Sequence, residues 1–364
     1  MWLSCLEIKG FRNLTQARLE LHERCNCFYG PNGAGKTSVL EAIYYLFLGR
    51  SFRHRLARRV IQDNTTGLTL FGELQDHFQQ IGVGIEHSLE KGKKVKLAGK
   101  VATVAEIARL IPVQLLNYDS YLLLQGEPSV RRQFIDWGLF HVKPSFFQLW
   151  LRVLTLLKQR NAAIRARARR EYLTMWDQEF AAACLELHNY RKEYLSQLIP
   201  IISELLVKLG TTFAIEIYYD PGWEENRELS ALLTHSLLQD LKLGYTTVGA
   251  HRADLKISSK KSFAKDVLSR GQQKLLICVM QLAQGILLNR LTNQPYLYLI
   301  DDLLAELDAS NSTVLIETLL QQPFIQFFFA DLDSKKLGGL LSTYLTTGKE
   351  FHLANGEIIA ERLI

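Results

Sequence analysis

The sequence predicts an α/β fold in which a mixed sheet with helices is interrupted by an inserted helical lobe. A glycine-rich loop lies between a predicted strand and a predicted helix near the N-terminus. In the last third of the chain, helical and strand-like segments alternate, which is typical of a parallel sheet. Between these parts, residues 144–210 almost lack turn residues and repeat apolar side chains at helical spacing, so we expect two antiparallel helices there.

Length and composition describe an ordinary folded chain. The 364 residues are enough for about two domains, and 48% hydrophobic residues allow a sizeable core. A net charge of +6 and a pI near 8.9 permit a nucleic-acid partner without showing one. We find no export signal and no apolar run approaching the roughly 20 residues that cross a bilayer. We therefore expect a soluble, cytoplasmic protein with no membrane partner.

The five cysteines do not predict a metal site. Cys25 and Cys27 form a C-x-C without a second pair or a nearby histidine to complete a tetrahedral site. An odd number of scattered thiols fits a reducing cytosol.

Residues 30–37 read G-P-N-G-A-G-K-T, a complete G-x-x-x-x-G-K-[ST] motif, or P-loop. A predicted strand over 18–30 leads into it, and apolar spacing predicts a helix over 35–48. Backbone N–H groups of such a loop wrap a phosphate, Lys36 adds charge between the β- and γ-phosphates, and the Thr37 hydroxyl ligates Mg²⁺. The loop residues expected to bind nucleotide are Gly30, Asn32, Gly33, Ala34, Gly35, Lys36, Thr37 and Ser38.

A second motif ends the apolar strand predicted over residues 296–301. A buried parallel strand delivers its terminal acids to the carboxyl edge of the sheet. We expect Asp301 to hold the Mg²⁺ shell and Asp302 to be the base that orients the attacking water. Acids at strand ends are common, and the P-loop upstream is what favours a catalytic role for this pair.

A third motif, Leu268-Ser269-Arg270-Gly271-Gln272, opens the helix predicted over residues 271–291. Ser269 is a natural N-cap at a helix end that carries partial positive charge. By itself the segment is an ordinary helix cap. Placed before a paired-acid strand, it also resembles the signature motif of ABC-type ATPases.

These motifs predict three parts of the chain. An ATPase head covers residues 1–143 and 246–364, and the helical lobe covers 144–210 or extends to about 245. The lobe is either a short coiled-coil-like pair or an ordinary helical bundle. The spacing of its apolar residues does not distinguish the two over so few helical turns. The other predicted strands are 3–8, 68–74, 80–87, 95–97, 213–219 and 325–329, and the other predicted helices are 226–242 and 310–320.

Together the motifs resemble those of SMC-like, ABC-type ATPase heads, and among them the RecF family. Four further segments carry this resemblance over nearly the whole chain. They are Ile8-Lys9-Gly10-Phe11-Arg12-Asn13-Leu14, Gly49-Arg50-Ser51-Phe52-Arg53, residues 123–136 (L-L-Q-G-E-P-S-V-R-R-Q-F-I-D) and Gly249-Ala250-His251-Arg252-Ala253-Asp254-Leu255. The last two separate RecF-like chains from other SMC-like heads.

The resemblance implies an ATP-dependent homodimer. In ABC-type ATPases the signature motif reaches the γ-phosphate held by the partner's P-loop, a role that would belong to Ser269, Gly271 and Gln272. Asp308, in the sequence Ala305-Glu306-Leu307-Asp308, matches a loop along the same interface.

The resemblance also implies roles around the nucleotide. Arg12 and Asn13 match residues that approach it, and Asp119 stands in a loop that senses Mg²⁺ and water, where the family usually has Pro-Glu. Ala250 replaces a proline, and the strand at 324–329 lacks the switch histidine of transporter ATPases. Asp302 is shorter than the glutamate typical of transporters. Because a misplacement of about 1 Å can cost on the order of 10²-fold in rate, we expect slow hydrolysis.

Arginines form the densest basic cluster just after the P-loop helix. Contacts of this type hold phosphates and position a protein on a duplex without reading its sequence. The residues expected to contact DNA are Arg50, Arg53, Arg55, Arg58 and Arg59. The alternative interpretation of this arginine cluster is a solvent-exposed helix face after the P-loop that binds no DNA. A second run, Arg165–Arg170, fits the exposed tip of the helical lobe.

The resemblance to RecF implies an ATP-dependent recombination mediator. Such a protein would bind double-stranded DNA and single-strand/double-strand junctions at gaps without sequence specificity. With RecR and RecO, it would promote RecA loading in gap repair, replication restart and SOS induction. The alternatives are the ATPase subunit of a transporter, an SMC-like tether and a monomeric P-loop kinase. The lobe is short for a tether, and a kinase would not need the signature motif.

Overall fold

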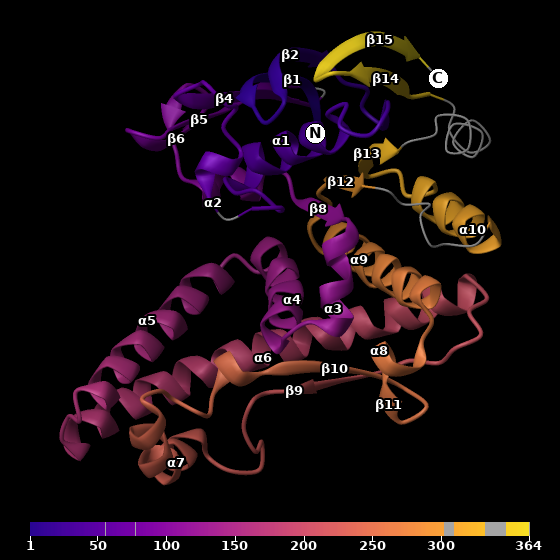
Figure 1. Ribbon diagram of the computed structural model, residues 1–364. Helices are drawn as coiled ribbons and strands as arrows, with labels where there is room; N and C mark the ends of the chain where they lie inside the picture. Colours follow the sequence, from indigo (N-terminus) through magenta and orange to yellow (C-terminus); the bar gives the residue numbers. More distant parts are fainter. Residues whose placement is uncertain (55, 77, 302–308, 332–346, 364) are drawn as a thin grey trace. The chain divides into compact units, whose positions relative to one another are not determined.

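The computed structural model describes residues 1–54, 56–76, 78–301, 309–331 and 347–363, apart from the side chains of residues 57, 170–172 and 309–312 (Figure 1). The contacts divide the chain into two compact units. The head unit comprises Met1–Ser120 and Thr292–Ile364, and the helical unit comprises Tyr121–Leu291.

Two sheets form the frame of the head unit. Their strands are β1 (Trp2–Phe11), β2 (Leu14–Glu20), β3 (Cys25–Tyr29), β4 (Gly67–Gln75), β5 (Gln80–Ser88), β6 (Gly92–Leu97), β7 (Lys100–Val101), β8 (Val113–Leu116), β12 (Tyr296–Asp301), β13 (Ile325–Asp331), β14 (Lys349–Ala354) and β15 (Glu357–Leu363). One sheet has the order β2-β1-β4-β5-β6-β7 and is antiparallel. The other has the order β15-β14-β3-β13-β12-β8, and only the β14–β15 pair in it is antiparallel. The mixed sheet is thus the one expected from the sequence.

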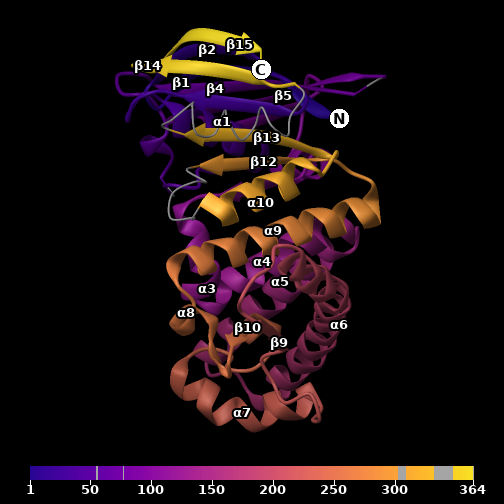
Figure 2. The ribbon, with the colours of Figure 1, turned by 90° about the vertical axis from the view of Figure 1, so that its right-hand side faces the viewer.

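Helix α1 (Lys36–Leu48) contacts both sheets, β12 and β13 on one side and β1 and β4 on the other (Figure 2). Its sequence is apolar on nearly every face, as a helix buried on both sides requires. Val39, Ile43 and Phe47 are fully buried in the core that the sheets share. The head unit also contains α2 (Val104–Leu110), α10 (Ala309–Leu320) and the 3₁₀ turn η1 (Ala57–Arg59).

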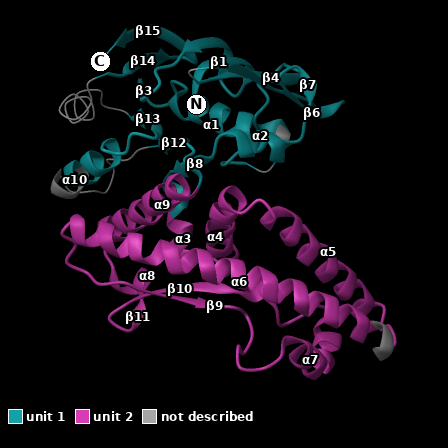
Figure 3. Ribbon diagram, turned by 180° about the vertical axis from the view of Figure 1, so that it is seen from behind, with its two compact units in different colours: residues 1–120, 292–364 teal, residues 121–291 magenta. Residues whose placement is uncertain are grey.

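The helical unit is built around one long helix, α6 (Figure 3). Its elements are α3 (Leu122–Gln125), α4 (Pro128–Val142), α5 (Phe146–Arg165), α6 (Arg170–Lys208), α7 (Leu229–Leu243), α8 (Ala264–Val267), α9 (Arg270–Thr292), β9 (Glu216–Asp220), β10 (Asp254–Ser259) and β11 (Ser262–Phe263). Helix α6 contacts α4, α5 and α7, and the strands form a small sheet of order β11-β10-β9.

A buried arginine ties three of these helices together. Arg160 of α5 donates from Nε to Asp177 Oδ1 at 2.6 Å and from Nη1 to Asp240 Oδ2 at 2.7 Å. Nη1 also contacts Thr246 Oγ1 at 2.8 Å. Burial raises the pKa of Asp177. Because removing one partner of a buried ion pair leaves the other charge uncompensated, this network specifies how α5, α6 and α7 meet.

The prediction of one strand over residues 18–30 is wrong. The chain leaves β2 at Glu20 and enters β3 at Cys25, and the two strands belong to different sheets. A polar turn separates them: His22 N donates to Asn26 Oδ1 at 2.7 Å, and Asn26 Nδ2 donates to His22 O at 2.8 Å. These two hydrogen bonds of the Asn26 side chain take the place of the backbone hydrogen bonds that a continuous strand would make.

The compact units do not follow the predicted domain bounds. The predicted lobe, 144–210 or up to 245, lies inside a unit that starts at Tyr121 and ends at Leu291. The α5–α6 pair is therefore part of a larger helical assembly that includes α4 and α7. The domain bounds stay a prediction, because contacts divide the chain without showing which part is the insertion.

Helix α9 is long and apolar enough to cross a membrane, by length and composition alone. This differs from the expectation that no segment reaches that length. Because 67% of its most apolar window is buried inside the protein, α9 matches the core helix of a soluble fold. It is weak evidence for a membrane span.

Candidate functional site

The P-loop turns tightly between β3 and α1. Gly30 has φ 152°, and a Cβ there would lie 2.2 Å from Leu353 O. Gly35 has φ 112°, and a Cβ there would meet the side chains of Leu14 and Asn13 at 3.0 and 3.3 Å. Both positions therefore require glycine. The loop ends at the N-terminus of α1, where backbone N–H groups favour an anion.

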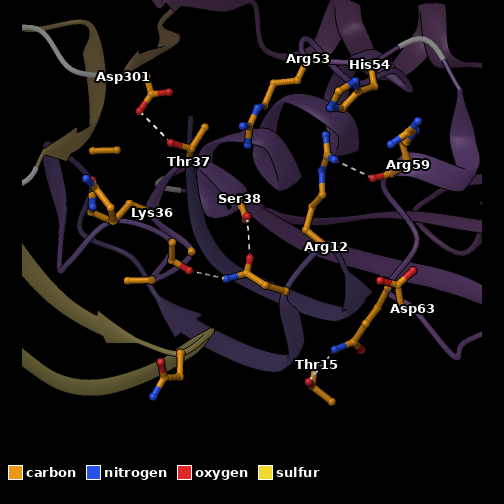
Figure 4. Close-up of a pocket in the computed structure, with 18 of the residues that line it drawn as sticks. Arg12, Thr15, Lys36, Thr37, Ser38, Arg53, His54, Arg59, Asp63 and Asp301 are labelled. Atoms are coloured by element: carbon orange, nitrogen blue, oxygen red, sulfur yellow. Dashed lines mark hydrogen bonds between the residues drawn. The ribbon is translucent and has the colours of Figure 1, made fainter.

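Lys36 and Thr37 begin α1 and line a cavity (Figure 4). Lys36 Nζ donates to the carbonyls of Gly30 and Pro31 at 2.7 and 3.0 Å. Thr37 Oγ1 donates to Asp301 Oδ1 at 3.1 Å. Asp301 is the last residue of β12, so the sheet brings together two motifs that lie far apart in the sequence.

The β1–β2 turn forms a second wall. Asn13 Nδ2 donates to Gly33 O at 3.0 Å, and Ser38 Oγ donates to Asn13 Oδ1 at 2.7 Å. The Asn13 amide thus braces both the P-loop and the first turn of α1. Arg12, with φ 54°, lines the same cavity.

The sequence did not predict a role for Glu41, which is fully buried in α1. It accepts hydrogen bonds from Arg12 Nε at 2.9 Å and Arg12 Nη2 at 2.7 Å, and another from Ser51 Oγ. Ser51 Oγ in turn accepts the backbone N–H groups of Arg53 and His54 at 2.9 and 2.8 Å. One carboxylate therefore fixes both Arg12 and the start of the basic segment. An acid inside an otherwise apolar helix was the available signal.

The cavity has a volume of about 1240 Å³. Of the head-unit residues predicted to bind nucleotide, all except Gly30 line it. Its walls come from the P-loop, the β1–β2 turn, the segment 53–63 and the ends of β12 and β13. The size is ample for a nucleotide, since ligand pockets commonly measure about 300–1,000 Å³.

The described arginines among those predicted to contact DNA lie in two places. Arg53, Arg58 and Arg59 line the P-loop cavity, whereas Arg50 is exposed outside it. Arg12 Nη1 donates to Arg59 O at 2.6 Å, which holds this segment against the β1–β2 turn. Arg55 lies outside the described residues. Three of the five predicted arginines therefore line the P-loop cavity itself.

A smaller cavity of about 360 Å³ is lined by residues from three predicted motifs. Asp119, in the 3₁₀ turn η2 (Tyr118–Tyr121), lines it together with Thr37 and Asp301. Asp119 is exposed. The predicted metal-binding residues thus share one cavity wall.

The signature segment lies in the helical unit. Ser269 is exposed, and Ser269 Oγ accepts the Gln272 N–H at 3.3 Å. Gln272 Oε1 accepts the Ser269 N–H at 3.0 Å, which completes a capping box. The predicted N-cap is therefore confirmed. Gly271 lies between them and is partly exposed.

The segment is anchored from behind. Gln273 is buried and donates from Nε2 to Leu268 O at 2.8 Å. Gln125 Nε2 donates to Gln273 Oε1 at 2.7 Å, and Tyr121 OH donates to Arg270 O at 3.2 Å. Ser269 thus sits on a rigid base while its hydroxyl stays at the surface.

The segments 123–136 and 249–255 pack on each other. Arg131 Nε and Nη2 contact the two carboxylate oxygens of Asp254 at 2.7 and 3.1 Å. Arg132 Nη1 donates to Ala253 O at 2.7 Å. This pairing was not predicted from the sequence, because the two segments are far apart along the chain.

His251 lies in the second of these segments, close to the ring of Phe180. Its Nε2 donates to Thr246 O at 3.0 Å. Burial, aided by the nearby charge of Arg252 and opposed by the hydrogen bond to Thr246 O, lowers the pKa of His251 to about 4. The ring is therefore neutral at physiological pH.

Several predicted residues lie outside the described part of the chain. They are Asp302, Asp308 and the rest of the segment 305–308. Among the residues that the structure describes, no group of three or more His, Cys, Asp or Glu side chains could hold a metal ion.

Comparisons of sequence place the chain among known proteins. The family model of the RecF/RecN/SMC N-terminal domain matches residues 2–345. The chain is 36% identical over 362 residues to the DNA replication and repair protein RecF of Cellvibrio japonicus, covering 98% of this chain and 99% of that protein. It is 37% identical over 360 residues to the RecF of Coxiella burnetii, covering 99% of each.

Comparisons of structure agree on the fold. The recombination mediator protein RecF-ATP in the RecFOR pathway superposes with a TM-score of 0.86 at 24% identity, covering 99% of this chain and 97% of that one. The SMC head bound to the C-winged helix domain of ScpA superposes with a TM-score of 0.60 at 15% identity, covering 100% and 97%. The fold is therefore that of an SMC-like ATPase head. With its full-length sequence matches, this chain belongs to the RecF family of the RecF/RecN/SMC proteins.

Proposed function

We propose that this protein is an ATP-dependent, DNA-binding recombination mediator with slow ATPase activity. The observation that carries the proposal is the contact between Thr37 Oγ1 and Asp301 Oδ1 at 3.1 Å in the P-loop cavity. A P-loop hydroxyl and a strand-end carboxylate are the protein oxygens that a nucleotide-bound Mg²⁺ takes. The names of the relatives, DNA replication and repair protein RecF, support the biological part.

ATP would bind with its phosphates on the N-terminus of α1. The P-loop N–H groups and Lys36 would hold the β- and γ-phosphates, and Asn13 would keep the loop in shape. Thr37 and Asp301 offer the hard oxygen ligands that Mg²⁺ prefers, and water and phosphate oxygens would supply the rest. When bound, the metal neutralises charge that develops on the phosphates.

A second copy would complete each site. Ser269 is the exposed N-cap of α9, and Gly271 and Gln272 lie partly exposed in its first turn, at a helix N-terminus that attracts anions. We propose that they contact the γ-phosphate held by the partner's Lys36, and that Asp308 lies at the same interface. ATP would then hold the dimer together, and hydrolysis would release it.

Hydrolysis would be slow because Asp302, the base expected to orient water, is one methylene shorter than glutamate. Asp119, which shares a cavity wall with Thr37 and Asp301, would contact the metal shell through water. We expect turnover well below one per second for the pure protein. A rate of tens per second without DNA would contradict this assignment.

The dimer would bind duplex DNA and single-strand/double-strand junctions through phosphate contacts. Arg53, Arg58 and Arg59 line the cavity and would couple DNA to the bound nucleotide, and Arg50 and Arg55 would add further phosphate contacts. With RecR and RecO the protein would promote RecA loading in gap repair, replication restart and SOS induction. We place it in the cytoplasm, on the nucleoid.

The test is size-exclusion chromatography with and without ATP and Mg²⁺, comparing wild type with Lys36→Met and Ser269→Arg. Lys36→Met loses a phosphate contact and should bind no nucleotide. Ser269→Arg should bind ATP normally but remain monomeric. If Ser269→Arg dimerises with ATP as wild type does, the proposed composite site is wrong.

The transporter subunit and the SMC-like tether are weaker candidates. RecF relatives match the chain over its full length, whereas a transporter ATPase would need a membrane partner. Recovery of the purified protein with membranes would favour the transporter.

A further inference from the structure

One stretch of the chain combines eight cations with no acidic residue. Between Asp136 and Glu171 the sequence has neither Asp nor Glu, although the whole chain has 37 of them. The stretch contains Lys143, Arg152, Lys158, Arg160, Arg165, Arg167, Arg169 and Arg170. A solvated helix face normally mixes both signs of charge, so this bias needs a cause.

The structure places this stretch on α5 and on the turn that leads to α6 (Figure 1). Two of the cations have partners: Arg160 is buried in its ion-pair network, and Lys143 lies 3.7 Å from Glu193. The remaining cations with described side chains are exposed, and none forms an ion pair with any residue that the structure describes. They are Arg152, Lys158, Arg165, Arg167 and Arg169.

The turn itself gives a second, independent observation. Arg167 N donates to Ile164 O at 3.0 Å, and Ala168 N donates to Ala163 O at 3.0 Å. This pair of hydrogen bonds is the Schellman motif, whose left-handed residue is usually glycine. Here it is Arg167, at φ 49°. No described contact of the Arg167 side chain within the fold accounts for an arginine in place of glycine at this position.

The opposite side of α5 is already occupied. Leu149, Val153, Leu156 and Ile164 are buried, and α5 contacts α6 and α7. On α5 only two large apolar side chains are exposed, Leu151 at 38% and Leu154 at 40%, which is less apolar surface than a helix lying in a lipid layer would need. The exposed charges of α5 are all positive (Arg152, Lys158 and Arg165), and the turn that follows adds Arg167 and Arg169.

We propose that the exposed side of α5 and the α5–α6 turn bind the phosphate backbone of duplex DNA. This surface, which we call the α5 surface, would be a contact separate from the arginines at the P-loop cavity. The inference rests on the proposed DNA-binding function and names a second site for it. Arginine and lysine side chains spread along one helix hold successive phosphates and read no sequence.

The test is a salt titration of binding to a short duplex in the presence of ATP. The variant carries Arg165→Gln, Arg167→Gln and Arg169→Gln. These changes remove three positive charges but keep a residue with a Cβ at the left-handed position 167. The matched control carries Lys91→Gln, Lys94→Gln and Lys100→Gln. These lysines are exposed in the β5–β7 region of the head unit and form no ion pair with the residues that the structure describes. A third variant replaces the three arginines with lysine.

Each lost phosphate contact should reduce the slope of log affinity against log salt by about 0.9. The Gln variant should therefore lose up to about 2.7 in slope. Raising salt from about 50 to 200 mM should weaken wild type roughly 40-fold more than this variant. The lysine variant and the control should keep the wild-type slope. Unchanged urea unfolding midpoints would confirm that all three variants are folded.

Several results would overturn the proposal. If the Gln variant binds DNA with the wild-type affinity and slope, the α5 surface is not a DNA site, although the proposed function stands. If the control variant loses as much of the salt-dependence slope as the Gln variant does, the effect comes from net charge and not from the α5 surface. If wild type itself does not bind duplex, the proposed function fails as well. If the Gln variant keeps DNA binding but loses binding to purified RecR, the surface serves a protein partner.

Discussion

At the scale of single residues, Glu41 holds together two parts of the P-loop cavity wall, a role that its position in the sequence does not suggest. It is a fully buried carboxylate, and it accepts from Arg12 on one side and Ser51 on the other. Arg12 lies in the cavity wall, and Ser51 caps the segment that leads to Arg53. Glu41 is thus a positioning residue that acts through its neighbours.

We expect Glu41→Gln to lower the free energy of unfolding by about 2–3 kcal/mol, because it leaves the Arg12 guanidinium without its counter-charge. Urea unfolding measures this. The KM for ATP should rise more than kcat falls, because the cavity wall loosens while Lys36 and Asp301 remain. Glu41→Asp should recover part of the loss. A Gln variant as stable as wild type, with unchanged KM, would show that the pair positions nothing.

His251 gives the helical unit a pH dependence. Its pKa is about 4 in the fold, against 6.5 for an ordinary histidine, chiefly because of burial. Since the unfolded chain takes up the proton first, stability is lost as the pH falls through 6.5 and levels off below about 4.

Over that interval the loss attributable to His251 should reach about 3 kcal/mol. The measurement is the unfolding free energy of wild type and His251→Gln at several pH values between about 7 and 4. The difference between the two proteins should shrink as the pH falls. A difference that stays constant would show that His251 does not titrate in this way.

At the scale of elements, the turn between α5 and α6 has a charged residue at a position where glycine would be more stable. Arg167 occupies the left-handed position of a Schellman motif, where glycine avoids the Cβ clash. Its neighbour Arg169 has an ordinary φ of −59°.

Arg167→Gly should therefore stabilise the protein by about 1 kcal/mol, while it weakens DNA binding. Arg169→Gly is the matched control: it removes the same charge but should not stabilise, because its backbone carries no strain. Thermal unfolding of the two variants decides the matter. Equal effects on stability would contradict the strain at Arg167.

The elements also show what the sequence could predict. The P-loop, α1, β12 and the Ser269 cap were predicted because their chemistry is local: glycines at tight turns, an apolar strand ending in an acid, a serine before a helix. The split between β2 and β3 was not predicted, because it depends on the His22–Asn26 turn and on pairing with distant strands. The hairpin of β14 and β15 was likewise missed.

The candidate site likewise combines contacts that the sequence predicted with contacts that it did not. The meeting of Thr37 with Asp301 follows from the topology of parallel strands and was expected. The Arg12–Glu41 pair and the Arg131–Asp254 pair join segments with no local signal for each other. That Arg53, Arg58 and Arg59 would line the nucleotide cavity was also hidden, because it depends on how the segment after α1 folds back on the β1–β2 turn.

At the scale of the whole molecule, the proposed function depends on two copies of the chain that share one site. The P-loop and Asp301 lie in the head unit, and the exposed Ser269 lies in the helical unit. If Ser269 acts on the partner's nucleotide, then a variant without its own P-loop lysine can still serve a partner that has lost its serine.

The most direct measurement is therefore ATP hydrolysis by an equal mixture of Lys36→Met and Ser269→Arg. Each variant alone should be inactive. In a mixed dimer the intact P-loop of one copy meets the intact Ser269 of the other, so the mixture should regain up to about half of the wild-type rate per protomer. A mixture no more active than its separate components, under conditions where wild type dimerises, would contradict the shared site.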